Sequence, residues 1–381
     1  MNTPRDYTIA ISDDVLNEIR AKVAAYKWHQ MPDDGGWSYG ANLDYMKELS
    51  AYWLDKYDWR AHEAELNKFP HFKAEVDGID IHFIHEKGSG PSPTPLLISH
   101  GWPGSVFEFM EIIEPLAHPE RFGGRIEDAF DVIAPSLPGF GFSGRPSRPI
   151  GPRRIAEIFA KLMTETLGYE SFIAQGGDWG SAISSWLGYD HTSVCKGIHI
   201  NMLSMRHPDG PQGEAEQAWA KAMEAVVEAE GAYNQQQSTK PQTLSYAMMD
   251  SPVGIAAWLV EKFNTWSDTE GDDIESVYSK DHLLTNIMIY LVTGTFNTAS
   301  WIYYGRREEG GRELPAGGKR VEAPTGVALF PAEFLLWPPR SYVERTYNLV
   351  HWSEMPKGGH FAALEQPELL INDIRKFAKL L

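Results

Sequence analysis

The spacing of apolar and polar residues divides the chain into a helical beginning and a longer part in which strands and helices alternate. Apolar residues recur with the roughly 3.6-residue period of a helix at 13–28 and again at 43–59, on either side of a turn-rich segment at 31–40. Short apolar runs that end in turn residues then predict buried strands. These runs are at 79–86, 94–100, 130–136, 171–177 and 197–203.

Helical patterns separate several of the predicted strands. The pattern at 152–168 has Pro152 near its start and Gly168 past its end, which is the usual placement of these residue types at helix termini. Strands that alternate with helices are typical of a largely parallel sheet covered on both faces. We therefore expect an α/β core with a mostly parallel central sheet.

A region without strand patterns interrupts this core at 205–306. Helical patterns occur there at 214–233 and 251–266. In the second of these, Ser251 is placed as the N-cap and Pro252 as the first helical residue. This region is predicted to be a helical insertion that covers the core.

Strand patterns resume at 325–330 and 347–352, after a polar, glycine-rich loop at 306–320. A helix at 366–381 closes the chain, with apolar residues at Leu370, Ile374, Phe377 and Leu381. The patterns together predict an N-terminal helical arm at 1–70, a first core segment at 71–204, a helical cap at 205–306 and a second core segment at 307–381.

Composition and charge narrow the partners and the compartment. The 381 residues carry a net charge of −18, which disfavours binding to nucleic acid or to an anionic membrane. A single cysteine, Cys195, rules out an intrachain disulfide and fits a reducing compartment. The sequence shows no signal peptide and no run of about 18 apolar residues. We expect a soluble cytoplasmic protein, and the sequence leaves open whether it forms a homo-oligomer.

The first candidate for chemistry is the stretch QGGDWGS at 175–181, which reads as a sharp turn between a strand and a helix. Its glycines frame a central residue as in the nucleophile elbow of α/β-hydrolases, Gly-x-nucleophile-x-Gly. The central residue is Asp178, where an esterase would carry serine. A plain glycine-rich loop is the alternative interpretation.

The second candidate is HGWPGS at 100–105, which follows the predicted strand 94–100. In α/β-hydrolases a backbone N–H from this loop joins the N–H after the nucleophile to form the oxyanion hole. The two donors would be those of Trp102 and Trp179. A structural turn made by Pro103 and Gly104 is the alternative, and His100 itself is interpreted as structural.

The third candidate is His360, which lies in a glycine loop between the last predicted strand and the final helix. Glu333 follows the strand 325–330, so the order Asp178, Glu333, His360 agrees with the order of nucleophile, acid and histidine in α/β-hydrolases. The competing residues are less favoured, because they lie in a strand pattern or resemble surface charges. They are His351, Glu344 and Glu354.

An aspartate at the elbow changes the reaction. A carboxylate that attacks a saturated carbon forms an alkyl ester, and histidine-activated water can then cleave that ester at its carbonyl. A leaving halide needs N–H donors, whereas the oxygen of an opening epoxide needs a nearby acidic hydroxyl such as that of tyrosine. The cap offers Tyr233, Tyr303 and Tyr304, for which ordinary aromatic packing is the alternative interpretation.

Several long motifs resemble the microsomal-type epoxide hydrolases, which carry an N-terminal epoxide hydrolase arm. The motifs are QGGDWGS, HGWPGS, LPGFGFSG, DSPVGIAAWLVEKFNTW and GGHFAALEQPELL, and the similarity runs from about residue 5 to the C-terminus. The resemblance implies an α/β-hydrolase core, a helical cap, and an arm that wraps the core and helps to close the active site. The mammalian members carry a membrane anchor ahead of the arm, so we expect this chain to be a soluble, bacterial-like form.

The resemblance also implies roles for individual residues. Asp178 falls on the nucleophile, His360 on the general base and Glu333 on the charge-relay acid of the family. Tyr233 and Tyr303 fall on the two ring-opening tyrosines. The segment TASWIYY departs from the family pattern, because a tryptophan stands where an arginine is usual.

The expected reaction is hydrolysis of a small-molecule epoxide to a vicinal diol by water, with no metal and no organic cofactor. The expected pocket walls are Trp102, Trp179, Phe140 and Tyr304. A haloalkane dehalogenase that uses the same three residues is one alternative. A non-catalytic α/β-hydrolase scaffold that binds a ligand or partner is the other.

Overall fold

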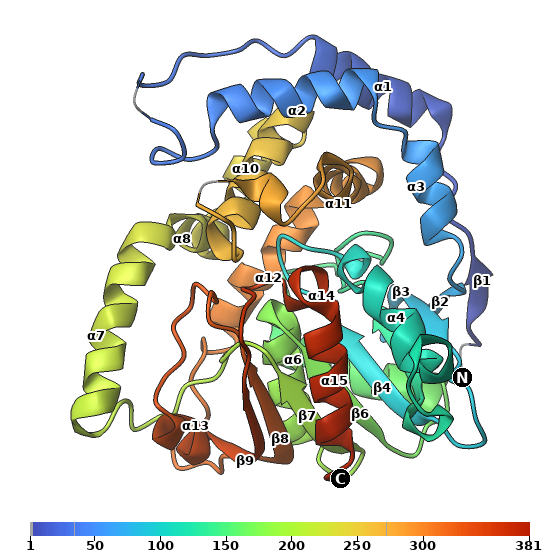
Figure 1. The fold of residues 1–381 in the computed structure, drawn as a ribbon, viewed down its shortest axis with the longest axis vertical. Helices are drawn as coiled ribbons and strands as arrows, with labels where there is room; N and C mark the ends of the chain where they lie inside the picture. Colours follow the sequence, from blue (N-terminus) through green and yellow to red (C-terminus); the bar gives the residue numbers. More distant parts are fainter. Residues whose placement is uncertain (1–2, 34, 272) are drawn as a thin grey trace.

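The computed structural model describes residues 3–33, 35–271 and 273–381. They form one nine-stranded sheet, with helices on both of its faces and a helical layer above it (Figure 1). The strands lie in the order β1-β2-β3-β5-β4-β6-β7-β8-β9. Their bounds are β1 Arg5–Tyr7, β2 His71–Val76, β3 Ile79–Glu86, β4 Thr94–Ser99, β5 Phe130–Pro135, β6 Phe172–Gly176, β7 Cys195–Ile200, β8 Val321–Leu329 and β9 Tyr347–Glu354.

The sheet is parallel from β5 through β4, β6, β7 and β8 to β9, and antiparallel where β1, β2 and β3 join it. The predicted α/β fold with a mostly parallel sheet is therefore confirmed. Every residue of β5 and β6 is buried, as expected for central strands covered on both faces.

Alternate residues of the central strands face opposite sides, which creates two apolar layers. Leu96 and Ile98 of β4 belong to the same apolar cluster as Ile374 of α15, whereas Leu97 belongs to the cluster that contains Ile183 of α6. The helices that cover the sheet are α4 Met110–Ala117, α5 Pro152–Lys161, α6 Asp178–Asp190, α13 Arg340–Thr346, α14 Ala362–Glu365 and α15 Pro367–Ala378. The helix predicted at 152–168 continues beyond α5 only as a π-helical turn, Leu162–Thr166. Leu381 lies beyond the end of α15 and is exposed.

The helical insertion predicted after β7 forms a cap over the carboxyl ends of the strands (Figure 1). Ser251 is the N-cap of α10, because its hydroxyl oxygen accepts a hydrogen bond from the N–H of Gly254 at 3.0 Å, and Pro252 is the first helical residue. The cap helices are α7 Gly213–Glu230, α8 Ala232–Thr239, α9 Pro241–Met248, α10 Pro252–Trp266, α11 Lys280–Thr293 and α12 Phe296–Glu308. Short 3-10 helices occur at Val106–Phe109, Pro119–Phe122, Ile126–Asp128 and Ile274–Ser276.

The first residues form an arm that runs from the edge of the sheet across the cap. Its helices are α1 Asp13–Ala24, α2 Leu43–Asp55 and α3 Trp59–Leu66. Helices α1 and α2 lie over α10 and α11 (Figure 1). The hydroxyl of Tyr57 is hydrogen-bonded to that of Thr285 in α11 at 3.1 Å.

Arm, cap and sheet share one hydrophobic core, which includes Leu49 of α2, Ile255 of α10 and Leu97 of β4. The boundaries at residues 70, 204 and 306 therefore stay predictions. In the part of the chain that the structure describes, no helix combines the length and the hydrophobicity needed to span a membrane.

Candidate active site

Asp178 lies at a turn between β6 and α6 that forces an unusual backbone conformation. Its φ is +43°, a region that residues other than glycine rarely adopt. A Cβ on Gly180 would lie 1.7 Å from the carbonyl oxygen of Ser99, and one on Gly176 would lie 2.2 Å from the backbone of Gly180. Close packing against β4 thus requires glycine at 180, and close packing within the turn requires it at 176, as the elbow interpretation expects.

Backbone and imidazole groups contact the two oxygens of the Asp178 carboxylate separately. The backbone N–H of Trp102 donates to Oδ1 at 2.8 Å, and Nε2 of His360 lies 3.5 Å from Oδ2. A Cβ on Gly101 would lie 2.2 Å from Oδ1, so glycine allows the HGWPGS loop to approach this closely. The N–H of Trp179, the second predicted donor, directly follows Asp178 at the start of α6.

His360 is held from its other side by Glu333, which lies in the turn after β8. Its Nδ1 lies 3.0 Å and 2.9 Å from the two carboxylate oxygens of Glu333, and both side chains are buried. Glu333 Oε1 also accepts a hydrogen bond from the N–H of Leu335 at 3.1 Å. The backbone N–H of His360 donates to the carbonyl of Trp266 at 3.0 Å, and the two rings pack edge to face. The ring is therefore fixed with Nε2 toward Asp178.

Charges around His360 set its protonation. Burial alone lowers the pKa of the imidazole, but the negative charges of Glu333 and Asp178 outweigh it and raise the pKa well above the ordinary value. The histidine thus carries a proton while both carboxylates are charged. Removal of either negative charge favours the neutral imidazole.

The competing residues of the sequence analysis lie elsewhere. His351 pairs with Asp373 at 2.9 Å, and Glu344 pairs with Arg340 at 2.8 Å. Glu354 accepts a hydrogen bond from the Trp352 indole at 3.2 Å.

His100 has a structural place behind the elbow. Its Nε2 accepts a hydrogen bond from the N–H of Leu137 at 3.1 Å, so its Nδ1 donates to the carbonyl of Gly101, 3.0 Å away. Burial lowers the pKa of this imidazole to about 4. A neutral His100 therefore ties the HGWPGS loop to the neighbouring loop.

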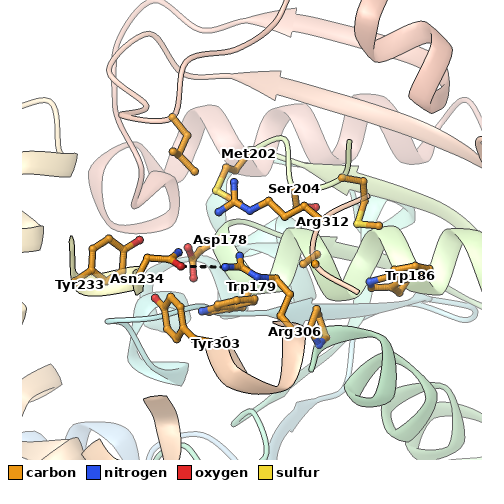
Figure 2. Close-up of a pocket in the computed structure, with 15 residues that line it drawn as sticks. Asp178, Trp179, Trp186, Met202, Ser204, Tyr233, Asn234, Tyr303, Arg306 and Arg312 are labelled. Atoms are coloured by element: carbon orange, nitrogen blue, oxygen red, sulfur yellow. Dashed lines mark hydrogen bonds between the residues drawn. The ribbon is translucent and has the colours of Figure 1, made fainter. Parts of the chain in front are cut away.

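Two cap tyrosines face the same carboxylate from above. Tyr233 lies at the start of α8 and Tyr303 in α12, and both hydroxyls point toward Asp178 (Figure 2). Tyr233 stacks on Trp102 with ring centres 5.1 Å apart, and Tyr303 meets Trp179 edge to face at 4.7 Å. Burial, with the nearby negative charge of Asp178, raises the pKa of Tyr233, and burial raises that of Tyr303 well above its usual range. Both phenols therefore stay protonated and able to donate.

A cavity opens beside Asp178 and is lined by both tyrosines and by Trp179. A second cavity, on the other side of the carboxylate, is lined by Trp102, Asp178 and His360.

Phe140 and Tyr304, expected as pocket walls, line neither of these two cavities. Phe140 is buried against His100 and Tyr290. Tyr304 follows Tyr303 in α12, where successive side chains are turned by about 100°. Neither residue is retained in the proposed site.

Sequence analysis missed several polar residues beside the elbow. Glu108, in the 3-10 helix Val106–Phe109 that follows the HGWPGS loop, lines the second cavity, and burial raises its pKa to about 8. Asn234, Arg306 and Arg312 line the first cavity. Asn234 lies next to Tyr233, a signal that could have singled it out, whereas nothing in the local pattern marked the other three. Across the described ranges, no group of three or more His, Cys, Asp or Glu side chains is placed to hold a metal ion.

Comparisons with known proteins place this chain in a family. Residues 4–109 match the family described as "Epoxide hydrolase N terminus", and residues 94–269 match the family described as "alpha/beta hydrolase fold". Epoxide hydrolase 1 of Sus scrofa is 38% identical over 405 aligned residues, which cover 99% of this chain and 89% of the relative.

Two solved structures are similar over nearly the full length. The epoxide hydrolase of Aspergillus niger has a TM-score of 0.86 at 30% identity, covering 99% of this chain and 96% of the other. The juvenile hormone epoxide hydrolase of the silkworm Bombyx mori has a TM-score of 0.88 at 29% identity, covering 100% and 96%. The chain therefore belongs to the epoxide hydrolases of the α/β-hydrolase fold that carry an N-terminal epoxide hydrolase arm.

Proposed function

We propose that this protein hydrolyses a small-molecule epoxide to a vicinal diol through a covalent ester on Asp178. The observation that carries the proposal is the arrangement around one carboxylate. His360 Nε2 lies 3.5 Å from its Oδ2, the Trp102 N–H binds its Oδ1, and two protonated tyrosines face it from the cap. The nucleophile, the base and the proton donors of the reaction would thus lie around the same place, next to the Asp178 carboxylate.

In the first step, Asp178 attacks a carbon of the epoxide ring. The Trp102 N–H already binds Oδ1, so Oδ2 is the oxygen that forms the new bond. The ring C–O bond breaks, and the oxygen that leaves the carbon takes a proton from Tyr233 or Tyr303. A donor positioned in the transition state typically contributes about 10²- to 10⁴-fold to the rate.

In the second step, water attacks the carbonyl carbon of the Asp178 ester. Formation of the ester removes the charge of Asp178, which is one of the two charges that raise the pKa of His360. The imidazole therefore releases its proton in the intermediate, and the tyrosinate left by ring opening takes this proton. The neutral His360 can then accept a proton from the attacking water. Negative charge that develops on Oδ1 is stabilised by the N–H of Trp102, with the N–H of Trp179 as the second donor. Collapse of the tetrahedral intermediate breaks the ester C–O bond, and the departing alkoxide takes the proton of the new carboxyl group. Release of the diol leaves the Asp178 carboxylate and the protonated His360 of the free enzyme.

Haloalkane dehalogenation is the second candidate, because one observation favours it. The indole N–H of Trp179 is buried beside Asp178 without a hydrogen-bond partner among the described residues, and such a group could bind a leaving halide. The paired tyrosine hydroxyls favour epoxide opening, since they supply protons that a halide does not need.

The test compares the two reactions in the same preparation. Purified protein is incubated with styrene oxide and, separately, with a 1-haloalkane, while diol and halide are measured by chromatography. We expect diol from the wild type, none from Asp178→Asn, and no halide. Asparagine tolerates the left-handed backbone at this position. Asp77→Asn is the matched control, because Asp77 is an aspartate with a positive φ outside both cavities. Halide release without diol from any epoxide would contradict the proposal, as would diol formation by Asp178→Asn at the wild-type rate.

A cytoplasmic location and the absence of nucleic-acid partners are part of the proposal. The net charge of −18 and the single buried cysteine, Cys195, support it.

A further inference from the structure

The cavity beside Asp178 continues outward into a larger one between the cap and the loop that follows α12. The shared lining includes Tyr233, Asn234, Arg306 and Arg312. A molecule that reaches Asp178 by this route therefore passes both arginines. Figure 2 shows the guanidinium ends of both arginines extending toward Asp178.

Neither arginine forms a salt bridge with a carboxylate among the described residues. Arg306 donates to the side-chain oxygen of Asn234 at 3.1 Å and lies over the ring of Trp179 at 4.7 Å. The Arg312 side chain makes no hydrogen bond or ion pair within residues 3–33, 35–271 and 273–381. This is unexpected in a chain with 52 acidic and 34 basic residues.

Both guanidinium groups are half-buried, and each lies near the positive charge of another arginine. Burial and the neighbouring Arg312 lower the pKa of Arg306 to about 10. Burial and the neighbouring Arg206 lower the pKa of Arg312. Cations that are partly removed from water and lie beside one another gain most from an added anion.

The acidic side chains nearby do not neutralise the two guanidinium groups. Glu230 and Glu313 line only the outer cavity, and Glu230 lies 3.8 Å from Lys262. Asp178 lines the inner cavity and attracts both guanidinium groups through space. Stabilisation of the Asp178 charge is therefore the alternative role, and the experiment has to separate it from binding of a ligand.

We propose that the epoxide substrate carries a carboxylate, which Arg312 and Arg306 bind while the epoxide ring meets Asp178. A guanidinium presents parallel N–H donors that match the two oxygens of a carboxylate. Trp186, Met202 and Leu335 line the same cavity and offer apolar contacts to the part of the substrate between its two ends. This inference rests on the proposed function, and it adds the substrate class.

The test uses a pair of substrates that differ only in charge, 4-(oxiran-2-yl)benzoate and its methyl ester. We expect kcat/KM to be higher for the acid than for the ester, and Arg312→Gln to lower this acid-to-ester ratio by roughly 10- to 100-fold, as for loss of a charge-assisted hydrogen bond. Arg306→Gln should lower the ratio as well. Arg121→Gln, at an exposed arginine that pairs with Glu114, removes the same charge and should leave the ratio unchanged.

Binding of the diol product separates this inference from the proposed function. The wild type should bind 4-(1,2-dihydroxyethyl)benzoate more tightly than its methyl ester in calorimetry, and Arg312→Gln should lose the difference. If the wild type binds the diol acid more tightly than its ester but hydrolyses neither epoxide, the proposed function is contradicted. The carboxylate-binding site is supported in that case. An unchanged acid-to-ester ratio in Arg312→Gln would overturn the inference. If kcat/KM falls equally for acid and ester, the role of Arg312 is to stabilise the charge of Asp178. If Arg312→Gln is misfolded by circular dichroism, Arg312→Lys replaces it, with a smaller loss of the ratio expected.

Discussion

At the scale of single residues, the reactivity of Asp178 depends on the different contacts of its two carboxylate oxygens. One oxygen is held by a backbone N–H and the other faces His360, so only one is free to form a bond. The backbone of Asp178 has a positive φ, which costs conformational energy. Such conformations are often found at functional sites. The charge of the carboxylate in turn sets the proton affinity of His360, which couples the two chemical steps.

His360→Gln is expected to separate these steps. Ring opening needs Asp178 and the tyrosines, whereas ester hydrolysis needs the imidazole, so the ester should accumulate. Intact-protein mass spectrometry should then show one substrate bound, and steady-state diol formation should fall by roughly 10²- to 10⁴-fold. His351→Gln is the matched control, because His351 lies in β9 and pairs with Asp373. Wild-type turnover by His360→Gln would contradict the assigned role.

Glu108 makes stability depend on pH in a definite direction. Its pKa is raised from 4.5 to about 8 in the folded protein, so the folded state binds this proton more tightly than the unfolded state. The stability it contributes is fully present below about pH 4.5 and is lost as the pH rises toward about 8.

We therefore expect urea unfolding to show a smaller loss of stability from pH 5 to pH 8 in Glu108→Gln than in the wild type. Glu111→Gln, at an exposed residue of α4, serves as the control. Identical pH dependence in Glu108→Gln and the wild type would show that the Glu108 pKa is not raised.

At the scale of elements, the turn from β6 into α6 is the part least able to change. The Cβ of an alanine at position 180 would lie 1.7 Å from a backbone oxygen of β4, which cannot move without breaking the sheet. Gly180→Ala is expected to destabilise the protein by about 1–3 kcal/mol and to displace Asp178.

Gly188→Ala lies in the same helix, where the nearest atoms are side-chain carbons at 3.0 Å and can shift. It should cost less and retain activity. Urea unfolding and diol formation of both variants check this. Equal effects of the two substitutions would contradict the assigned role of the elbow glycine.

The strands and helices that sequence patterns predicted are those with long apolar repeats or clear caps. The strand 79–86 matches β3, Ile79–Glu86, and Ser251 caps α10 as expected. β1, Arg5–Tyr7, was missed because a strand this short has no detectable period. β2, His71–Val76, was missed because its partly exposed positions interrupt the apolar run.

For the site, motifs were enough to single out residues that the fold brings together from distant positions, namely Asp178, Glu333 and His360. Glu108, Arg306 and Arg312 could not be found this way, because their significance lies in burial and in absent partners. The choice between Tyr303 and Tyr304 depends on the rotation of α12, which sequence alone does not determine. Roles in catalysis stay predictions for all of these residues.

At the scale of the whole molecule, the arm holds the cap to the sheet. It pairs with the sheet through β1 and packs on the cap through α1 and α2. Arm, cap and sheet contribute to one hydrophobic core. We infer that the cap does not open as an independent unit while the arm is docked.

Leu49→Ala tests this coupling, because Leu49 of α2 is fully buried in the shared core. The substitution is expected to cost about 2–5 kcal/mol and to shift one common unfolding transition to lower temperature. Lys47→Ala, on the exposed side of α2, should have little effect. Scanning calorimetry that instead shows a separate early transition for the arm would mean that the parts unfold independently.

The most direct test of the covalent reaction follows the oxygen atom. A single turnover of an epoxide such as styrene oxide, with enzyme in excess, is run in heavy-oxygen water, and diol and peptides are analysed by mass spectrometry. Water attacks the ester carbonyl, so the label should enter the peptide that contains Asp178, and the first diol should carry the ordinary oxygen of that carboxylate. Label found in the first diol and absent from Asp178 would show that water opens the ring directly, and would contradict nucleophilic attack by Asp178.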